Sequence, residues 1–170
     1  MKVAAAKVAQ FISSPPDTVR AILLYGPDAG LVRERAELLT KLIIEDPKDP
    51  FRIADFSASE LRDDPARLSD EASAIAFTGG RRVVRIRDAT DAVAKSIISY
   101  CKAPFGDALV IIEAGALSPR SKLRAAFEGS KQAAAIPCYA DEGKGLREIV
   151  IETLGQSQIN VSPDAVSYLM

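Results

Sequence analysis

Five short apolar runs, separated by segments of helical periodicity, constrain the fold of this chain more than any other feature of its sequence. The runs are rich in Val, Ile, Leu and Ala, and they cover residues 20–25, 51–56, 82–87, 108–113 and 134–139. Strands that alternate with helices in this way are typical of a parallel sheet covered by helices. The sequence therefore predicts an α/β domain built on a five-stranded parallel sheet.

The segments between the runs carry helix signals. Ser57 and Glu60 have the spacing of a capping box, in which each residue satisfies a free backbone amide at the start of a helix. Asp64-Pro65 predicts a second helix start, because proline is favoured in the first turn of a helix. Three apolar residues after this start share one predicted helix face: Leu68, Ala72 and Ile75.

The first run leads into a loop that resembles a phosphate-binding loop but lacks the residues that contact phosphate. A working loop has the pattern Gly-x-x-x-x-Gly-Lys-Ser/Thr, because its amides cradle phosphate, its lysine neutralises the charge and its hydroxyl holds magnesium. Here Gly26 and Gly30 are one residue closer together, and Leu31 and Val32 stand where the lysine and the hydroxyl belong. We predict the topology of a nucleotide-binding domain with a degenerate loop that does not bind ATP.

The second half of a nucleotide-hydrolysing site is also incomplete. Glu113 ends the fourth run without the usual neighbouring aspartate. A lone carboxylate makes a poor magnesium site, and an acid that faces solvent or a helix N-terminus is the simpler interpretation. The chain contains no histidine, which excludes Ser-His and Cys-His nucleophile pairs. The sequence predicts no catalytic residue, no metal site and no cofactor.

Four arginines lie within seven residues, at positions 81, 82, 85 and 87, and Arg85 and Arg87 share one face of the predicted strand. Such a cluster can contact nucleic acid phosphates or the acidic surface of a partner protein. The formal net charge of the chain is −1 and no aromatic residue interleaves the cluster, which favours a solvated or salt-bridged face. Contact with DNA or a partner through Arg81, Arg82 and Arg85 stays open.

The segment 74–80 lies where a helix ends and precedes a strand, and in it Phe77 stands close to Gly79 and Gly80. An aromatic residue at the end of an element can anchor in the pocket of a partner, because exposed aromatics are frequent energetic hot spots of interfaces. The other interpretation is that Phe77 fills the core beneath the helix. Spacing alone does not separate the two.

The composition of the chain indicates the cellular compartment in which it works. No apolar stretch reaches the length that spans a membrane, and the N-terminus lacks the apolar core of a signal peptide. Cys101 and Cys138 have no metal-ligand spacing, which favours buried thiols in a reducing compartment. We expect a cytoplasmic protein that has no membrane partner.

After Tyr139 the pattern becomes helical only. Residues 1–141 are predicted to form the first domain, and residues 142–170 the start of a helical domain. A new amphipathic pattern begins after Ser162-Pro163 and still runs at Met170. We therefore expect a truncated fragment of a longer protein.

Residues 21–34 closely resemble the start of the delta subunit of the bacterial DNA polymerase III clamp loader, in its alphaproteobacterial form. The segment 77–84 is similar to the part of that family that precedes its third strand. Residues 135–141, followed by Leu146-Arg147, are similar to its passage from the first domain into the second. The resemblance covers essentially all of the chain.

The resemblance implies an AAA+-like, P-loop NTPase-like first domain followed by the start of a helical lid domain, with the collar domain absent. It implies a component of the DNA polymerase III holoenzyme with no intrinsic catalysis, which binds and opens the sliding clamp without hydrolysing ATP itself. The implied partners are the clamp (the beta subunit), the gamma/tau and delta prime subunits and, through the assembled complex, primed DNA.

In this family an apolar pair at the end of a helix inserts into a pocket on the clamp. Carried onto this sequence, the pair falls on Ala76 and Phe77, with Ala76 in place of the usual leucine. The resemblance therefore implies that Phe77 is the main clamp-binding residue, with Ile75 beside it. Two alternatives are a small P-loop-like ATPase or kinase with an atypical loop, and a nucleic-acid-binding module that uses residues 81–87.

Overall fold

The computed structural model describes residues 1–46, 49–76, 79–139 and 165. The chain divides into two units, Met1–Cys138 and Tyr139–Met170. Almost all of the second unit, including the predicted lid helices, lies outside the described residues. The predicted domain boundary at 141/142 therefore stays a prediction, and the helices and strands described below belong to the first unit.

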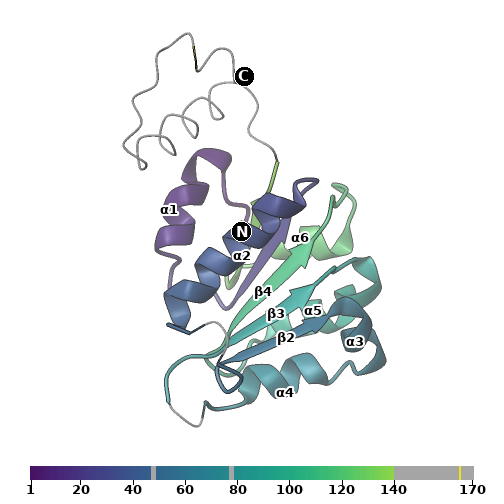
Figure 1. The fold of residues 1–170 in the computed structure, drawn as a ribbon. Helices are drawn as coiled ribbons and strands as arrows, with labels where there is room; N and C mark the ends of the chain where they lie inside the picture. Colours follow the sequence, from purple (N-terminus) through teal and green to yellow (C-terminus); the bar gives the residue numbers. More distant parts are fainter. Residues whose placement is uncertain (47–48, 77–78, 140–164, 166–170) are drawn as a thin grey trace. The chain divides into compact units, whose positions relative to one another are not determined.

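The first unit is built on a five-stranded parallel sheet, as predicted (Figure 1). The strands lie in the order β2-β3-β4-β1-β5, so β1 is flanked by β4 and β5. Their bounds are Ala21–Tyr25 for β1, Ile53–Ser57 for β2, Val83–Arg87 for β3, Leu109–Ala114 for β4 and Ala133–Pro137 for β5. All five carboxyl ends consequently meet at one edge of the sheet, the carboxyl edge, and all five amino ends at the opposite amino edge.

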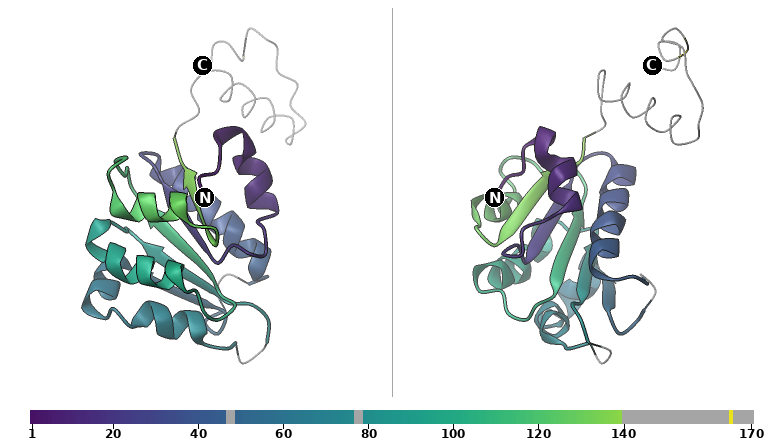
Figure 2. Two further views of the ribbon diagram at one scale, coloured as in Figure 1. Left: turned by 180° about the vertical axis from the view of Figure 1, so that it is seen from behind. Right: turned by 90° about the vertical axis from the view of Figure 1, so that its left-hand side faces the viewer.

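Helices cover both faces of the sheet (Figure 2). One face carries the short helix η1 (Ala5–Lys7), α1 (Val8–Ser13) and α2 (Ala29–Ile43). The other face carries α3 (Ala58–Asp63), α4 (Arg67–Ser73), η2 (Asp91–Val93), α5 (Ala94–Lys102) and α6 (Lys122–Gly129). The capping box predicted from Ser57 and Glu60 is present at the start of α3.

Each face of the sheet has its own hydrophobic core. Val84 and Ile86 of β3 are fully buried under α3 to α6, in the larger core. Because side chains alternate along a strand, Arg85 and Arg87 share the opposite face, as the sequence predicted, and the structure shows that this face is on the α2 side. The α2 core lies over β1, β4 and β5 and includes Val32, Ala36 and Leu39. Polar residues of β2 and β3 are thus left beside α2 at the carboxyl edge.

One helix prediction is wrong. The helix α4 ends at Ser73, and Ala74 has extended backbone angles, so Ile75 lies beyond the helix rather than on its buried face with Leu68 and Ala72. Helix α1 was not predicted at all. The prediction of buried thiols is confirmed, since Cys101 and Cys138 are both free and buried. No helix among the described residues is long and apolar enough to cross a membrane.

Candidate functional site

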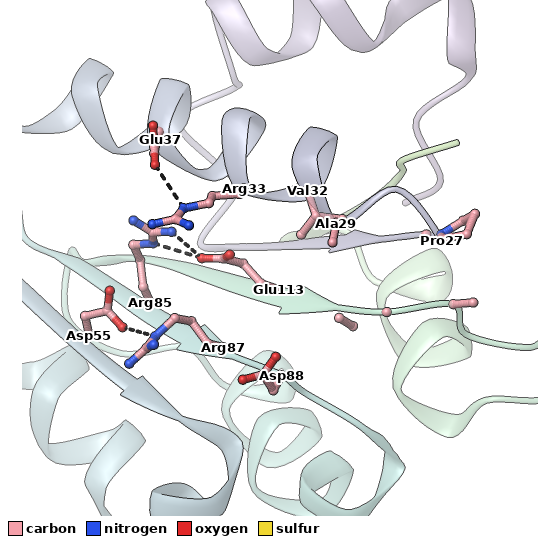
Figure 3. Close-up of a pocket in the computed structure, with 14 residues that line it drawn as sticks. Pro27, Ala29, Val32, Arg33, Glu37, Asp55, Arg85, Arg87, Asp88 and Glu113 are labelled. Atoms are coloured by element: carbon pink, nitrogen blue, oxygen red, sulfur yellow. Dashed lines mark hydrogen bonds and ion pairs between the residues drawn. The ribbon is translucent and has the colours of Figure 1, made fainter. Parts of the chain in front are cut away.

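The carboxyl edge of the sheet carries a cavity of about 470 Å³, beside the degenerate loop (Figure 3). It lies between the start of α2 and the ends of the strands β2, β3 and β4. Open parallel sheets bind ligands at this edge, outside the carboxyl ends of their strands. The residues around this cavity therefore decide whether the chain has a nucleotide site.

Gly26 begins the loop for a reason of packing. A Cβ atom added to it would lie 1.8 Å from the Cys138 carbonyl oxygen. The Cys138 amide donates a hydrogen bond of 2.7 Å to the Tyr25 carbonyl, which holds the end of β5 against the end of β1. The close approach of these two backbones, rather than of a phosphate, requires glycine here.

The start of α2 is occupied by a carboxylate of the loop itself. Asp28 is the N-cap residue, and its Oδ1 accepts a hydrogen bond of 2.9 Å from the Leu31 amide. A phosphate would need the same free amides and the same positive end of the helix dipole. Val32 is buried in the α2 core. The loop thus offers a negative charge where a working loop binds one.

Glu113 does not face solvent, so the interpretation of a solvated acid is wrong. The residue is 8% exposed, and its Oε1 accepts hydrogen bonds of 2.9 and 2.6 Å from Nε and Nη2 of Arg85 on the neighbouring strand. Burial raises the pKa of Glu113, and Arg85 acts in the opposite direction. The carboxylate is committed to an ion pair, and the described residues contain no group of three or more acids, cysteines or histidines that could hold a metal.

The other charged residues around the cavity also pair with one another (Figure 3). The Nε of Arg87 lies 2.6 Å from an oxygen of Asp55, and the Nε of Arg33 lies 3.4 Å from an oxygen of Glu37. With Asp88 at the rim, the lining holds four acidic residues and three arginines. This balance disfavours a triphosphate, which needs uncompensated positive charge.

The arginine cluster is divided between the two edges of the sheet. Arg85 and Arg87 form ion pairs at the carboxyl edge, whereas Arg81 and Arg82 precede β3 at the amino edge. Arg82 is buried, and its Nη2 lies 3.0 Å from Oε2 of Glu71. Arg81 donates to the carbonyls of Asp107 and Val19 at 2.6 and 3.4 Å. The four guanidinium groups do not form one basic patch, and contact of Arg81, Arg82 or Arg85 with DNA or a partner stays a prediction.

The three predicted clamp-binding residues lie in the connection between α4 and β3, at the amino edge. Ile75 is 92% exposed, whereas Ala76 is 4% exposed and accepts a hydrogen bond of 2.9 Å from the Gly79 amide through its carbonyl. Phe77 lies outside the described residues. Of the two described residues, Ile75 is the one that a partner can reach.

Comparison with solved structures identifies the fold. The Bacillus subtilis DNA clamp loader delta protein is similar to this chain with a TM-score of 0.71 and 18% identity, over 98% of this chain and 51% of that one. A DNA polymerase III gamma subunit-related protein from Thermotoga maritima has a TM-score of 0.53 and 15% identity, over 86% of this chain and 49% of that one. The chain has an AAA+-like fold.

A variant of Thermotoga maritima RuvB shares this AAA+-like fold, with a TM-score of 0.50 and 15% identity, over 95% of this chain and 51% of that one. The AAA+-like chain spans about half the length of each of these proteins. No family model matches its sequence, and neither does any curated protein.

Two features of the sites escaped the sequence analysis. Asp28 stands three residues before Leu31, and this N-cap signal was present in the sequence. The pairing of Arg85 with Glu113 joins residues 28 positions apart on neighbouring strands. Only the strand order β3-β4, which the sequence does not specify, brings them together.

Proposed function

We propose that this chain is the clamp-binding part of a clamp-loader delta-like subunit of a DNA polymerase III holoenzyme. In this proposal the connection between α4 and β3 binds the sliding clamp and opens it for loading onto primed DNA. The chain itself does not hydrolyse ATP. The gamma/tau and delta prime subunits are the proposed neighbours in the loader, and primed DNA is reached through the assembled complex.

The exposure of Ile75 carries this proposal. A large aliphatic side chain that is 92% exposed has a cost in water, and an apolar partner surface would remove it. It stands two residues beyond the end of α4, in the segment that resembles the clamp-binding segment of the delta family. The similarity in fold to a clamp loader delta protein over 98% of the chain supports the same assignment.

Clamp opening needs no chemistry in this chain. A protein that binds the open form of a ring more tightly than the closed form shifts the ring toward opening by the difference in binding free energy. The carboxylate of Asp28 at the start of α2 and the ion pair of Glu113 with Arg85 support a subunit without its own nucleotide. In this mechanism ATP acts in the other subunits.

Calorimetric titration with the sliding clamp of the same organism tests the proposal. We expect Phe77→Ala to weaken binding by about 2 kcal/mol, in the range of aromatic hot spots, and Ile75→Ala by about 1 kcal/mol. Leu38→Ala is the matched control, because Leu38 is an exposed aliphatic residue on α2, away from the proposed surface. Failure of the unmodified protein to bind at about 50 µM clamp would contradict the proposal.

The alternative of an atypical ATPase or kinase has a separate test. Such an enzyme must bind nucleotide, and a bound ligand raises the midpoint of thermal unfolding. We expect no shift with millimolar Mg-ATP. A clear concentration-dependent shift would favour the enzyme.

A further inference from the structure

Among the described residues, Arg81 and Arg20 have no carboxylate partner, unlike the three arginines that follow Arg81 along the chain. Arg82, Arg85 and Arg87 each form an ion pair with a carboxylate. Arg81 instead donates only to main-chain carbonyls, and Arg20 donates through its Nη1 to the Asp107 carbonyl at 3.3 Å. Arg52, before β2, also donates to main-chain carbonyls, but it does not share the Asp107 carbonyl with Arg81 and Arg20.

The two guanidinium groups lie close to each other and in part away from water. Burial is the main cause that lowers the pKa of Arg81, and the neighbouring charge of Arg20 lowers it further. Asp107 and Asp17 act in the opposite direction from a distance. A guanidinium has five N–H donors, so Arg81 keeps at least three without an acceptor in the described part of the chain. An acceptor from outside the chain would stabilise this arrangement.

A buried donor of α5 also lacks a partner among the described residues. Tyr100 of α5 is 2% exposed, and its hydroxyl has no hydrogen-bond partner among the described residues. Burial raises the pKa of Tyr100 to about 12, and the charges of Arg20 and Arg81 act in the opposite direction. A buried hydroxyl without an acceptor costs about 1–3 kcal/mol, but a group on the surface of a partner cannot reach this one because it is buried.

Arg20 and Arg81 are tied to the end of α4, where Ile75 is exposed. A Cβ atom on Gly106 would lie 2.1 Å from the Ala72 carbonyl and 3.3 Å from Ser73 Cα, so the loop before β4 packs against the last turn of α4. The next residue, Asp107, holds Arg81 and Arg20 through its carbonyl. Ile75 comes two residues after Ser73, and Arg81 belongs to the same connection.

We propose that Arg20 and Arg81, which share the Asp107 carbonyl, form an anion site that receives a carboxylate of the partner protein whose apolar pocket receives Ile75. This inference rests on the proposed function and names a second contact of the same surface. A nucleic acid fits less well, because it offers no pocket for Ile75. Phosphate-backbone binding also needs several cations presented together, and this site has two.

Titration of the sliding clamp at about 50 mM and 300 mM salt tests the site, because a charge-assisted contact weakens with salt. We expect Arg81→Gln and Arg20→Gln each to weaken binding about tenfold at low salt and to reduce its salt dependence. Tyr100→Phe is expected to leave binding unchanged, because its hydroxyl is buried. Arg120→Gln, at an exposed arginine beyond β4, is the matched control and is expected to bind as the unmodified protein does.

The outcomes separate this site from the proposed function. If Arg20→Gln and Arg81→Gln keep full affinity and salt dependence while Ile75→Ala loses affinity, the anion site is wrong and clamp binding stands. If the unmodified protein does not bind the clamp, both proposals fail. Loss of binding to primed DNA with unchanged clamp affinity would assign the site to phosphate and overturn the carboxylate. Arg20→Gln removes only one long hydrogen bond, so a thermal melt should show that this variant still folds.

Discussion

The two edges of the sheet differ in how their arginines are paired. At the carboxyl edge, Arg85 pairs with Glu113 and Arg87 with Asp55. At the amino edge, Arg82 pairs with Glu71, but Arg81 and Arg20 donate to main-chain carbonyls and Tyr100 has no partner among the described residues. The carboxyl edge, where this fold class normally binds its ligand, is internally satisfied, whereas the amino edge retains donors for a partner.

This difference indicates that one fold can lose the ligand site at the carboxyl edge of its sheet and acquire a different binding site at the amino edge. A site that binds a ligand needs groups that are unsatisfied without the ligand. At the carboxyl edge such unsatisfied groups are already paired. The Asp28 carboxylate accepts from the Leu31 amide at the start of α2, and Arg85 neutralises Glu113. Four predictions test how far the two edges differ.

The largest effect is expected for the ion pair of the carboxyl edge. Arg85→Ala leaves Glu113 buried without its partner, and removal of one member of a buried pair costs about 3–5 kcal/mol. We expect the free energy of unfolding in urea to fall by about that amount at pH 7. Arg87→Ala is the control, because its pair with Asp55 is largely exposed and is expected to contribute less than about 1 kcal/mol.

The loss of stability in Arg85→Ala is expected to depend on pH. Burial raises the pKa of Glu113, and without Arg85 the pKa rises further. A carboxyl with a raised folded pKa stabilises the fold fully below its unfolded value and loses that contribution as pH rises through the folded value. The variant should therefore approach the stability of the unmodified protein near pH 4, below the ordinary glutamate pKa of about 4.3. A difference independent of pH would contradict the buried pair.

The second prediction separates the two loop glycines. Gly26→Ala is expected to cost about 3 kcal/mol, because its Cβ would overlap the Cys138 carbonyl and force two backbones apart. Gly30→Ala lies in the first turn of α2, where the nearest atom, 3.3 Å away, is Oδ1 of Asp28. It is expected to change stability by less than about 1 kcal/mol. Equal effects in urea unfolding would show that Gly26 is not a packing residue.

The third prediction concerns the carboxylate at the start of α2. Asp28→Ala removes the N-cap and is expected to cost about 1 kcal/mol of stability. We expect no nucleotide binding in exchange, because Leu31 and Val32 still supply neither a cation nor a hydroxyl. Thermal unfolding without Mg-ATP measures the loss of stability, and the same measurement with Mg-ATP tests for nucleotide binding. A nucleotide-dependent shift in the variant alone would mean that Asp28 is the sole barrier to binding.

Much of the fold could be predicted because it follows from local sequence patterns. All five strands were visible as apolar runs such as Leu109–Ala114, and the capping box of Ser57 and Glu60 is a contact between residues three apart. The end of α4 was harder, since Leu68, Ala72 and Ile75 share a helical spacing that continues after the helix stops at Ser73. Tertiary contacts of Ala72 with the loop at Gly106 form there, and no local signal marks them.

The sites could be predicted only in part. The missing lysine and hydroxyl of the loop are visible in the sequence, and residues of this loop line the cavity at the carboxyl edge. Which arginines pair could not be predicted, because Arg85 and Arg81 are four residues apart and lie at opposite edges of the sheet. The partner of each depends on the strand beside it, and strand order is a property of the whole fold.

The smallest effect is expected at the amino edge, with the opposite sign. Tyr100→Phe removes a buried hydroxyl that has no acceptor among the described residues, and we expect stability to rise by about 0.5–1 kcal/mol. Burial raises the pKa of Tyr100 to about 12. The neutral hydroxyl therefore favours the folded state fully below the unfolded pKa of about 10, and this stabilisation is lost as the pH rises toward 12. The advantage of the phenylalanine variant in urea unfolding should therefore grow between pH 9 and 11. A loss of stability at neutral pH would reveal an acceptor for the hydroxyl within the chain, and the two edges would then differ less than their charges indicate.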